Sequence, residues 1–315
     1  MTTLGQDRPE TLRLGSRKSS LARTQAALVA SSLGDTCPAV ELVPMSVQGD
    51  LARGTPDETL PDKKKWVVDL EEALLSGGID LAVHSGKDVP VAIADGTRLI
   101  PVLPRAAPHD VLIRKRGRTH ADLDRWPDES AIGTSSLRRK AFLRAANPRL
   151  TLVDLRGNVP TRLEKLVRSD HLAAIVVAAA GLARLRVDLS PEMEAMPLPA
   201  EVMLPAAHQG ILVAQFCAGR SDVEGCLQMV VDEACQAEWR AERAFTTRVG
   251  AGCHSCLGVH AVGCGGGELL LRARALSRDG RSSLEDEEQG SADLAEQLGT
   301  RLSARMIAKG IKNLL

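Results

Sequence analysis

The sequence predicts an α/β protein that ends in a smaller α+β domain. The chain has 315 residues, which is enough for two or three domains with separate cores. From residue 11 onward, short apolar runs alternate with polar loops and amphipathic stretches, a pattern typical of successive strand and helix units. From about residue 229 the pattern changes to two helical stretches followed by strands between glycine-rich turns.

The first α/β block begins close to the N-terminus. Apolar runs and periodicity predict strands at residues 11–14, 40–43 and 79–83, and helices at residues 20–33 and 66–75. Gly77 and Gly78 end the second helix, because glycine is favoured just after a helical C-terminus. Three prolines between residues 101 and 108 indicate a linker to the next block.

The second α/β block repeats the same alternation. We predict strands at residues 131–133, 150–155 and 173–180, and helices at residues 134–146 and 160–168. The most apolar stretch, residues 173–183, is too short to cross a bilayer and is better explained as a buried strand. A proline-rich segment at residues 193–205 returns the chain toward the first block.

The last part contains two helices at residues 222–248, short strands at residues 257–288 and a final amphipathic helix at residues 291–311.

Composition limits the classes of partner. Forty Lys and Arg balance forty Asp and Glu, so a global polyanion surface for nucleic acid is not expected. Aromatic residues make up only 2%, which argues against stacking platforms for single strands. The start of the chain has charges and a proline but no apolar signal region, and seven cysteines show no compact disulfide spacing. We therefore expect a cytoplasmic protein without nucleic-acid or membrane partners.

Cationic and hydroxyl side chains follow the predicted strands at their carboxyl ends, where ligands bind in open α/β sheets. Hydroxyls and free N–H groups at a helix start bind anions, and arginine adds bidentate recognition of carboxylate or phosphate. Any one of these arginines fits a solvated helix surface as well, but the same placement recurs in both blocks. The pattern predicts a cleft for a ligand with several acidic groups. The residues are Arg17, Ser19, Ser85, Lys87, Thr134, Ser135, Ser136, Arg138, Arg139, Arg156, Gly157, Asn158, Arg162, Gly181 and Arg184.

Two further features leave alternatives open. Asp88 would stay ionised in a cationic cleft and could hold a positive group or an N–H donor, but it also fits an ordinary turn before Val89 and Pro90. Cys253 lies among small residues, as an exposed attachment point or nucleophile requires. With Cys256 it also forms a CxxC pair, a weak signal for half a zinc site or for a redox pair.

Taken together, these motifs resemble the porphobilinogen deaminase family, also called hydroxymethylbilane synthases. The matching stretches occur in the family's order and cover nearly the whole chain. They are residues 17–22 (RKSSLA) with Gln25, 83–90 (VHSGKDVP), 133–139 (GTSSLRR), 155–158 (LRGN) with Thr161 and Arg162, 180–184 (AGLAR), 204–206 (LPA) with Gln209 and Gly210, and 241–244 (AERA) leading to Gly252 and Cys253.

The resemblance implies two periplasmic-binding-protein-like α/β lobes and a C-terminal α+β domain that carries a cofactor cysteine. Residues 1–105 with 207–228 would form the first lobe, with the catalytic aspartate and a mobile loop. Residues 106–206 would form the second lobe, and residues 229–315 the C-terminal domain. The implied reaction joins four porphobilinogen molecules head to tail with release of ammonia and gives hydroxymethylbilane, in tetrapyrrole (heme) biosynthesis.

The family's residue roles carry over position by position. Cys253 would hold a covalent dipyrromethane cofactor through a thioether, and Asp88 would be catalytic. The implied cofactor-binding residues are Ser85, Lys87, Thr134, Ser136, Arg138, Arg139, Arg156, Arg162 and Arg184. The implied substrate-binding residues are Arg17, Ser19, Gln25, Lys63, Asn158, Gly181 and Gln209. No metal is implied.

The resemblance also implies a monomer that hands its product to uroporphyrinogen-III synthase. The chain departs from the family pattern at Gly86, His208 and Cys256, where Met, Gly and Pro are usual, and in the segment 63–66. We therefore predict an active but divergent member. The competing hypotheses are an inactive or repurposed paralogue that binds a polycarboxylate, and a cysteine-based zinc or redox protein.

Overall fold

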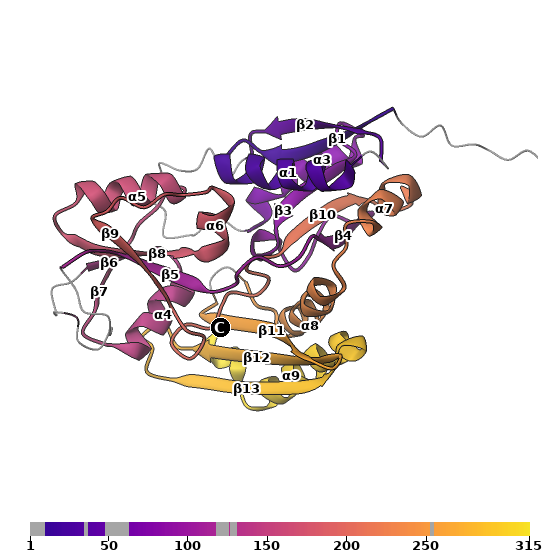
Figure 1. Ribbon diagram of the computed structural model, residues 1–315. Coiled ribbons are helices and arrows are strands. Elements are labelled where there is room, and N and C mark those ends of the chain that lie inside the picture. Colours follow the sequence, from indigo (N-terminus) through magenta and orange to yellow (C-terminus); the bar gives the residue numbers. More distant parts are fainter. Residues whose placement is uncertain (1–9, 35–36, 48–62, 118–125, 127–130, 253–254) are drawn as a thin grey trace, which may run out of the picture.

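The computed structural model describes residues 10–34, 37–47, 63–117, 126, 131–252 and 255–315. Within these ranges the strands form two five-stranded sheets and one three-stranded sheet. Each sheet belongs to a separate body in Figure 1, with the first lobe at the top, the second at the left and the C-terminal body below. None of the helices in these ranges combines the length and the apolar composition needed to cross a bilayer.

The first lobe is built on a sheet of strand order β2-β1-β3-β10-β4. β1 pairs in parallel with β2 and β3, whereas β10 runs antiparallel between β3 and β4. The strands are β1 (Thr11–Arg17), β2 (Ala39–Met45), β3 (Leu81–Ser85), β4 (Thr97–Val102) and β10 (Leu212–Cys217). The helices are α1 (Ser20–Leu33), α3 (Val68–Leu75) and α7 (Ser221–Gln228), with short 3-10 turns η3 (Lys63–Trp66) and η4 (Gly86–Asp88).

The second lobe repeats this plan with strand order β7-β6-β8-β5-β9. Its central strand β8 is buried along its whole length, as its run of alanine, isoleucine and valine predicts. The strands are β5 (Asp110–Lys115), β6 (Ala131–Gly133), β7 (Thr151–Val153), β8 (Leu172–Ala178) and β9 (Met193–Pro197). The helices are α4 (Leu137–Ala146), α5 (Val159–Arg168) and α6 (Ala179–Arg184).

The chain crosses between the lobes twice, from β4 to β5 and from β9 to β10. After each crossing it enters a sheet at the fourth position and runs antiparallel to the third strand. β5 is thus the first strand that the chain forms on entering the second lobe, and β10 is the strand that it forms on returning to the first lobe. This arrangement agrees with the two periplasmic-binding-protein-like lobes that the family resemblance implies.

The C-terminal domain packs two helices on an antiparallel sheet. Its elements are α8 (Glu233–Val249), β11 (Leu257–Gly265), β12 (Glu268–Leu276), β13 (Ser283–Ser291), η6 (Ala292–Leu294), α9 (Ala295–Ala308) and η7 (Ile311–Leu314). Asp232 caps the start of α8 by accepting a hydrogen bond from the Cys235 N–H, and Gly250 ends it in the left-handed conformation. A Cβ at Gly299 would lie 2.2 Å from the carbonyl oxygen of Ala241, so glycine permits the close approach of α9 to α8.

The structure confirms the α/β class with a C-terminal α+β domain and corrects several element bounds. β3 extends to Ser85, so this residue belongs to the strand and not to the loop after it. The predicted strand 173–180 ends at residue 178, because the chain turns there into α6. The proline-rich linker begins within β4, and the helix expected from residue 134 begins at Leu137. The short strands expected at residues 257–288 are three long, paired strands.

Candidate active site

Two adjacent cavities of about 480 and 460 Å³ lie where the three bodies meet. They share part of their walls, including Arg17, Lys87, Asp88 and Arg139. The first cavity extends between the two lobes, and the second reaches the C-terminal domain at Ala251, Gly252, Ser255 and Leu257. We call the two cavities together the cleft.

Most of the residues that the sequence singled out line this cleft. They are Arg17, Ser19, Gln25, Ser85, Lys87, Asp88, Ser135, Ser136, Arg138, Arg139, Arg156, Gly157, Asn158, Arg162, Gly181, Arg184 and Gln209. Thr134 is not in the lining: it is fully buried, and its Oγ1 accepts a hydrogen bond from the Ser136 N–H at 3.3 Å.

Two of the predicted residues cannot be placed by their side chains. Cys253 lies outside the described residues, but its neighbours Gly252 and Ser255 line the second cavity. Lys63 is the first residue of η3, and its side chain likewise lies outside the described part of the chain.

Three helices begin at the cleft, and each is capped by a residue that the sequence assigned to ligand binding. Ser19 Oγ accepts from the Ala22 N–H at the start of α1, at 3.3 Å. Ser136 Oγ accepts from the Arg139 N–H at the start of α4, at 3.4 Å, and Asn158 Oδ1 accepts from the Thr161 N–H at the start of α5. These caps direct the positive ends of three helix dipoles toward the cleft, which favours a bound anion.

Burial disfavours the charged forms of Arg162 and Arg184. Burial lowers the pKa of each guanidinium to about 10, and the nearby Arg139 adds to this effect at Arg162. Arg162 Nε donates to the carbonyl of Gly157, whose positive φ of 122° is open mainly to glycine. Arg184 Nη2 donates to the Gly210 carbonyl at 2.6 Å. Both side chains stay charged at neutral pH, in surroundings where an arriving carboxylate would interact strongly.

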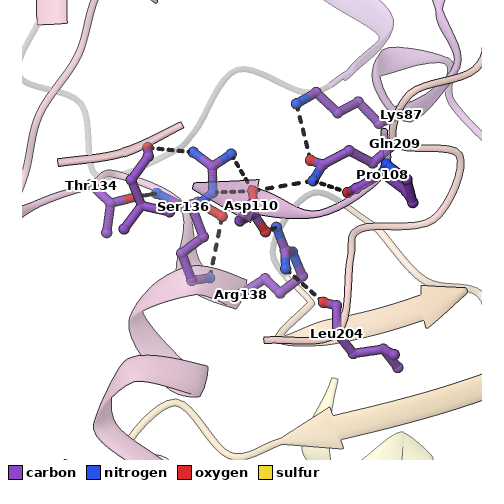
Figure 2. Close-up of polar contacts among 10 residues, drawn as sticks. Lys87, Pro108, Asp110, Thr134, Ser136, Arg138, Leu204 and Gln209 are labelled. Atoms are coloured by element: carbon purple, nitrogen blue, oxygen red, sulfur yellow. Dashed lines mark hydrogen bonds and ion pairs between the residues drawn. The ribbon is translucent and has the colours of Figure 1, made fainter. Parts of the chain in front are cut away.

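A buried carboxylate that sequence reasoning missed, Asp110, joins the two lobes (Figure 2). Its Oδ2 accepts from Arg138 Nη2 at 2.5 Å, and its Oδ1 accepts from Arg139 Nη2 at 2.7 Å. Oδ1 also accepts from Gln209 Nε2 at 3.1 Å, and Gln209 Oε1 in turn accepts from Lys87 Nζ at 3.2 Å. The network therefore runs from the second lobe to the turn that carries Asp88.

The charged groups in this network shift one another's pKa values. Burial by itself would raise the pKa of Asp110, but Arg138 and Arg139 hold it well below its usual range. Burial, reinforced by Arg139, lowers the pKa of Lys87 to about 8. Arg138 and Arg139 are both buried and donate to Asp110, so part of their hydrogen-bonding capacity serves the protein itself. Only its position before the apolar run 111–113 marks Asp110 in the sequence, and many surface aspartates share that feature.

Other lining residues were also missed, among them Trp66, Lys165, His208 and Arg243. The guanidinium of Arg17 lies 4.0 Å from the centre of the Trp66 ring, and both residues border the two cavities. Lys165 and Arg243 add two more cations to the described lining. Among the described residues that line the cleft, Asp88 is the only acidic one. The described lining of the cleft thus combines many cations with a single carboxylate.

The cysteines that the structure describes do not form a second site. Cys256 is buried, its Sγ lies 3.6 Å from the Leu137 carbonyl oxygen, and burial raises the pKa of its thiol. Cys264 is exposed on the C-terminal sheet. Within the described ranges, no three His, Cys, Asp or Glu side chains are grouped so that they could hold a metal ion.

Comparisons with known proteins agree with the geometry. Residues 12–225 match the family model for the porphobilinogen deaminase dipyromethane cofactor binding domain, and residues 236–308 match the model for the C-terminal domain. The porphobilinogen deaminase of Roseiflexus sp. (strain RS-1) is 40% identical over 308 residues, which cover 97% of this chain and 99% of that protein. That of Moorella thermoacetica is 39% identical over 306 residues, or 96% of this chain and 95% of that protein.

The similar solved structures are much more distant in sequence. The periplasmic VFT2 domain of Bordetella pertussis BvgS is 12% identical and aligns with 70% of this chain and 86% of that one, at a TM-score of 0.44. The family assignment depends on the full-length relatives and on the two family models, which together match most of the sequence. The chain belongs to the porphobilinogen deaminase family.

Proposed function

We propose that this chain is a transferase that joins four porphobilinogen molecules head to tail on a covalent primer. Water then cleaves the bond between the primer and the first added pyrrole, which releases hydroxymethylbilane. The observation that carries the proposal is a cleft lined by many cations and, among its described residues, one carboxylate. Each porphobilinogen has an acetate and a propionate group, so every unit added to the chain brings two more negative charges. A long cationic cleft suits such a ligand better than a pocket for a single anion would.

The cations have distinct tasks in this proposal. Arg17, Arg156, Arg162 and Arg184 bind the acetate and propionate groups, with Lys87, Ser85 and the three capped helix starts. Arg138 and Arg139 are held by Asp110, which fixes their guanidiniums at the wall of the second cavity. Because these groups are positioned before a ligand arrives, less conformational freedom is lost on binding.

Asp88 supplies the negative charge that the chemistry needs. In each condensation the C–N bond of an aminomethyl group breaks and ammonia leaves, and a C–C bond forms to the next pyrrole, which then loses a proton. The carbon that loses ammonia becomes cationic, and a carboxylate nearby stabilises that charge and accepts hydrogen bonds from pyrrole N–H groups. Asp88 lies between the two cavities, where both pyrroles would be within its reach.

The described residues fit a covalent dipyrromethane. Gly252 and Ser255, which flank Cys253, border the second cavity together with Arg138, Arg139 and Asp88. A dipyrromethane held there by a thioether to Cys253 supplies the covalent primer from which the product grows. Ser85, Lys87 and Ser136 would bind its carboxylates together with the arginines, and Thr134 would support them from behind through its hydrogen bond to Ser136.

We further propose the division into residues 1–105 with 207–228, 106–206 and 229–315, which is supported by the points where the chain passes between the three sheets. Ser19, Gln25, Asn158, Gly181 and Gln209 would border the incoming substrate, together with Lys63. A monomer in the cytoplasm that hands hydroxymethylbilane to uroporphyrinogen-III synthase completes the proposal.

The test compares two aspartates that lie seven residues apart. Asp88→Asn removes the charge from the cleft with little change in volume, and we expect the rate of ammonia release from porphobilinogen to fall by about 100-fold or more. Asp95→Asn makes the same change at an exposed residue outside the cleft and should leave the rate unchanged. Circular dichroism checks that both variants are folded. A wild-type protein that binds porphobilinogen but releases no ammonia would contradict the proposal.

A further inference from the structure

The turn that carries Lys87 and Asp88 starts at a glycine whose backbone does not require one. Gly86 is buried at the start of η4, and it is not among the glycines with positive φ. The space for a side chain there is tight. A Cβ at this position would lie 3.0 Å from His208 Cβ and 3.2 Å from both the His208 carbonyl oxygen and Trp239 Cζ3.

At His208 the situation is reversed: a residue with a side chain stands where the backbone conformation favours glycine. Its φ is +61°, in the left-handed region that residues with a Cβ rarely adopt. Nevertheless its side chain is buried, with the imidazole against Trp239 at 4.2 Å between ring centres and 43° between planes. Its backbone N–H donates to the buried Glu242 Oε2 at 2.5 Å. A strained backbone that is held this firmly indicates that the ring has a specific place to fill.

The segment around His208 is bonded directly to the turn that it covers. The Gly86 N–H donates to the Ile211 carbonyl at 2.8 Å, and the Ile211 N–H donates to the His208 carbonyl at 3.2 Å. Lys87 Nζ donates to Gln209 Oε1. A displacement of residues 208–211 would therefore move Lys87 and Asp88 with it.

We propose that His208 is a positioning residue, and that Gly86 and His208 form one packing unit which fixes the turn of Lys87 and Asp88 against the cleft. The His208 Cβ, the His208 carbonyl oxygen and Trp239 border the space into which a side chain at position 86 would extend. The two positions are therefore coupled in size, because the Cβ at position 208 would be the nearest atom to a Cβ at position 86. The catalytic part of this inference rests on the proposed function, whereas the packing part does not.

The test is a double-mutant cycle with two different replacements at position 208. Gly86→Ala places a Cβ 3.0 Å from His208 Cβ and should lower kcat by about tenfold to 100-fold, because small displacements of catalytic groups have large effects on rate. KM for porphobilinogen should change by less than about threefold, because most carboxylate-binding groups stay in place. Adding His208→Gly removes the opposing Cβ and frees the backbone, and should recover most of the lost kcat.

The second replacement, His208→Ala, separates the effect of the Cβ at position 208 from the effect of losing the imidazole. His208→Ala also removes the ring but keeps the Cβ that opposes position 86, so it should not rescue Gly86→Ala. Gly225→Ala is the matched control, because a Cβ there meets nothing within 4 Å and the residue lies in α7, outside the cleft lining. It should leave kcat and the melting temperature as in the wild type, apart from a small gain in helix propensity.

Two results would overturn the inference. Additive effects of Gly86→Ala and His208→Gly on the melting temperature would show that the two positions do not form a unit. Coupled melting temperatures with wild-type kcat in every variant would show a packing pair without any positioning role. A wild-type protein without turnover would overturn the proposed function and the positioning role with it, and the melting-temperature cycle would still decide whether the packing unit exists.

Discussion

Lys87 is the residue whose charge depends most clearly on its surroundings. Burial lowers its pKa to about 8, Arg139 acts in the same direction, and Asp88 and Asp110 oppose them. The ammonium is therefore present below about pH 8 and is lost as the pH rises through that value. If Lys87 binds a substrate carboxylate, kcat/KM for porphobilinogen should fall as the pH rises through about 8.

The matched variant for this prediction is Lys87→Arg, whose guanidinium stays charged throughout the accessible pH range. Its kcat/KM should be lower than that of the wild type because the geometry differs, but the decline near pH 8 should be absent. The measurement is the initial rate of porphobilinogen consumption at low substrate concentration across the pH range. An identical decline in both proteins would assign it to another group.

At the same scale, the sequence predicted which residue types gather at the cleft but not how they pair. Arginines after the strands were found because their positions recur in both blocks. Asp110 was missed because a charge at the start of a strand looks the same in sequence whether it is exposed or fully buried. The consequence for Arg138 and Arg139 was therefore missed as well: both donate to a carboxylate of the protein itself.

At the scale of elements, the start of α4 depends on Asp110. Asp110→Asn leaves two buried guanidiniums without their anionic partner and should lower the free energy of unfolding by about 3–5 kcal/mol. Asp154→Asn is the control, because Asp154 pairs with Lys140 at 2.7 Å from a side chain that is 71% exposed, and its loss should change stability by less than about 1 kcal/mol. Urea unfolding measures both. Equal small losses would show that the buried pairs contribute little.

Elements with a local signal were predicted well. The bounds of α1 agree with the prediction, because its apolar face and its Ser19 cap are both visible in sequence. β4, β5, β9 and β10 were missed, because the sequence alone does not show which strands they pair with. β10 also contains Gln215, which is fully buried and donates to Glu71 Oε1 at 2.9 Å. In the sequence, Gln215 makes this short apolar run look unlike a buried central strand. Its hydrogen-bond partner Glu71 lies 144 positions away, so the sequence does not show that the amide is paired.

At the scale of the whole molecule, one buried carboxylate connects the three bodies. Glu242 Oε1 accepts from Arg105 Nη1 and from the Ala261 N–H, both at 2.8 Å, and Oε2 accepts from the His208 N–H. Arg105 and His208 lie in the two crossings between the lobes, and Ala261 lies in β11. The sequence predicted three bodies from changes in pattern, but it could not show this connection, since its partners are far apart along the chain.

The central claim, that this chain builds a tetrapyrrole on a covalent primer, is tested most directly by the intact mass of the denatured protein after exposure to porphobilinogen. The wild type should carry an excess that matches two linked pyrrole units, and Cys253→Ala should carry none. Cys256→Ser should keep the excess, because the Cys256 thiol is buried against α4. An unmodified wild type, or an excess that persists in Cys253→Ala, would contradict the account.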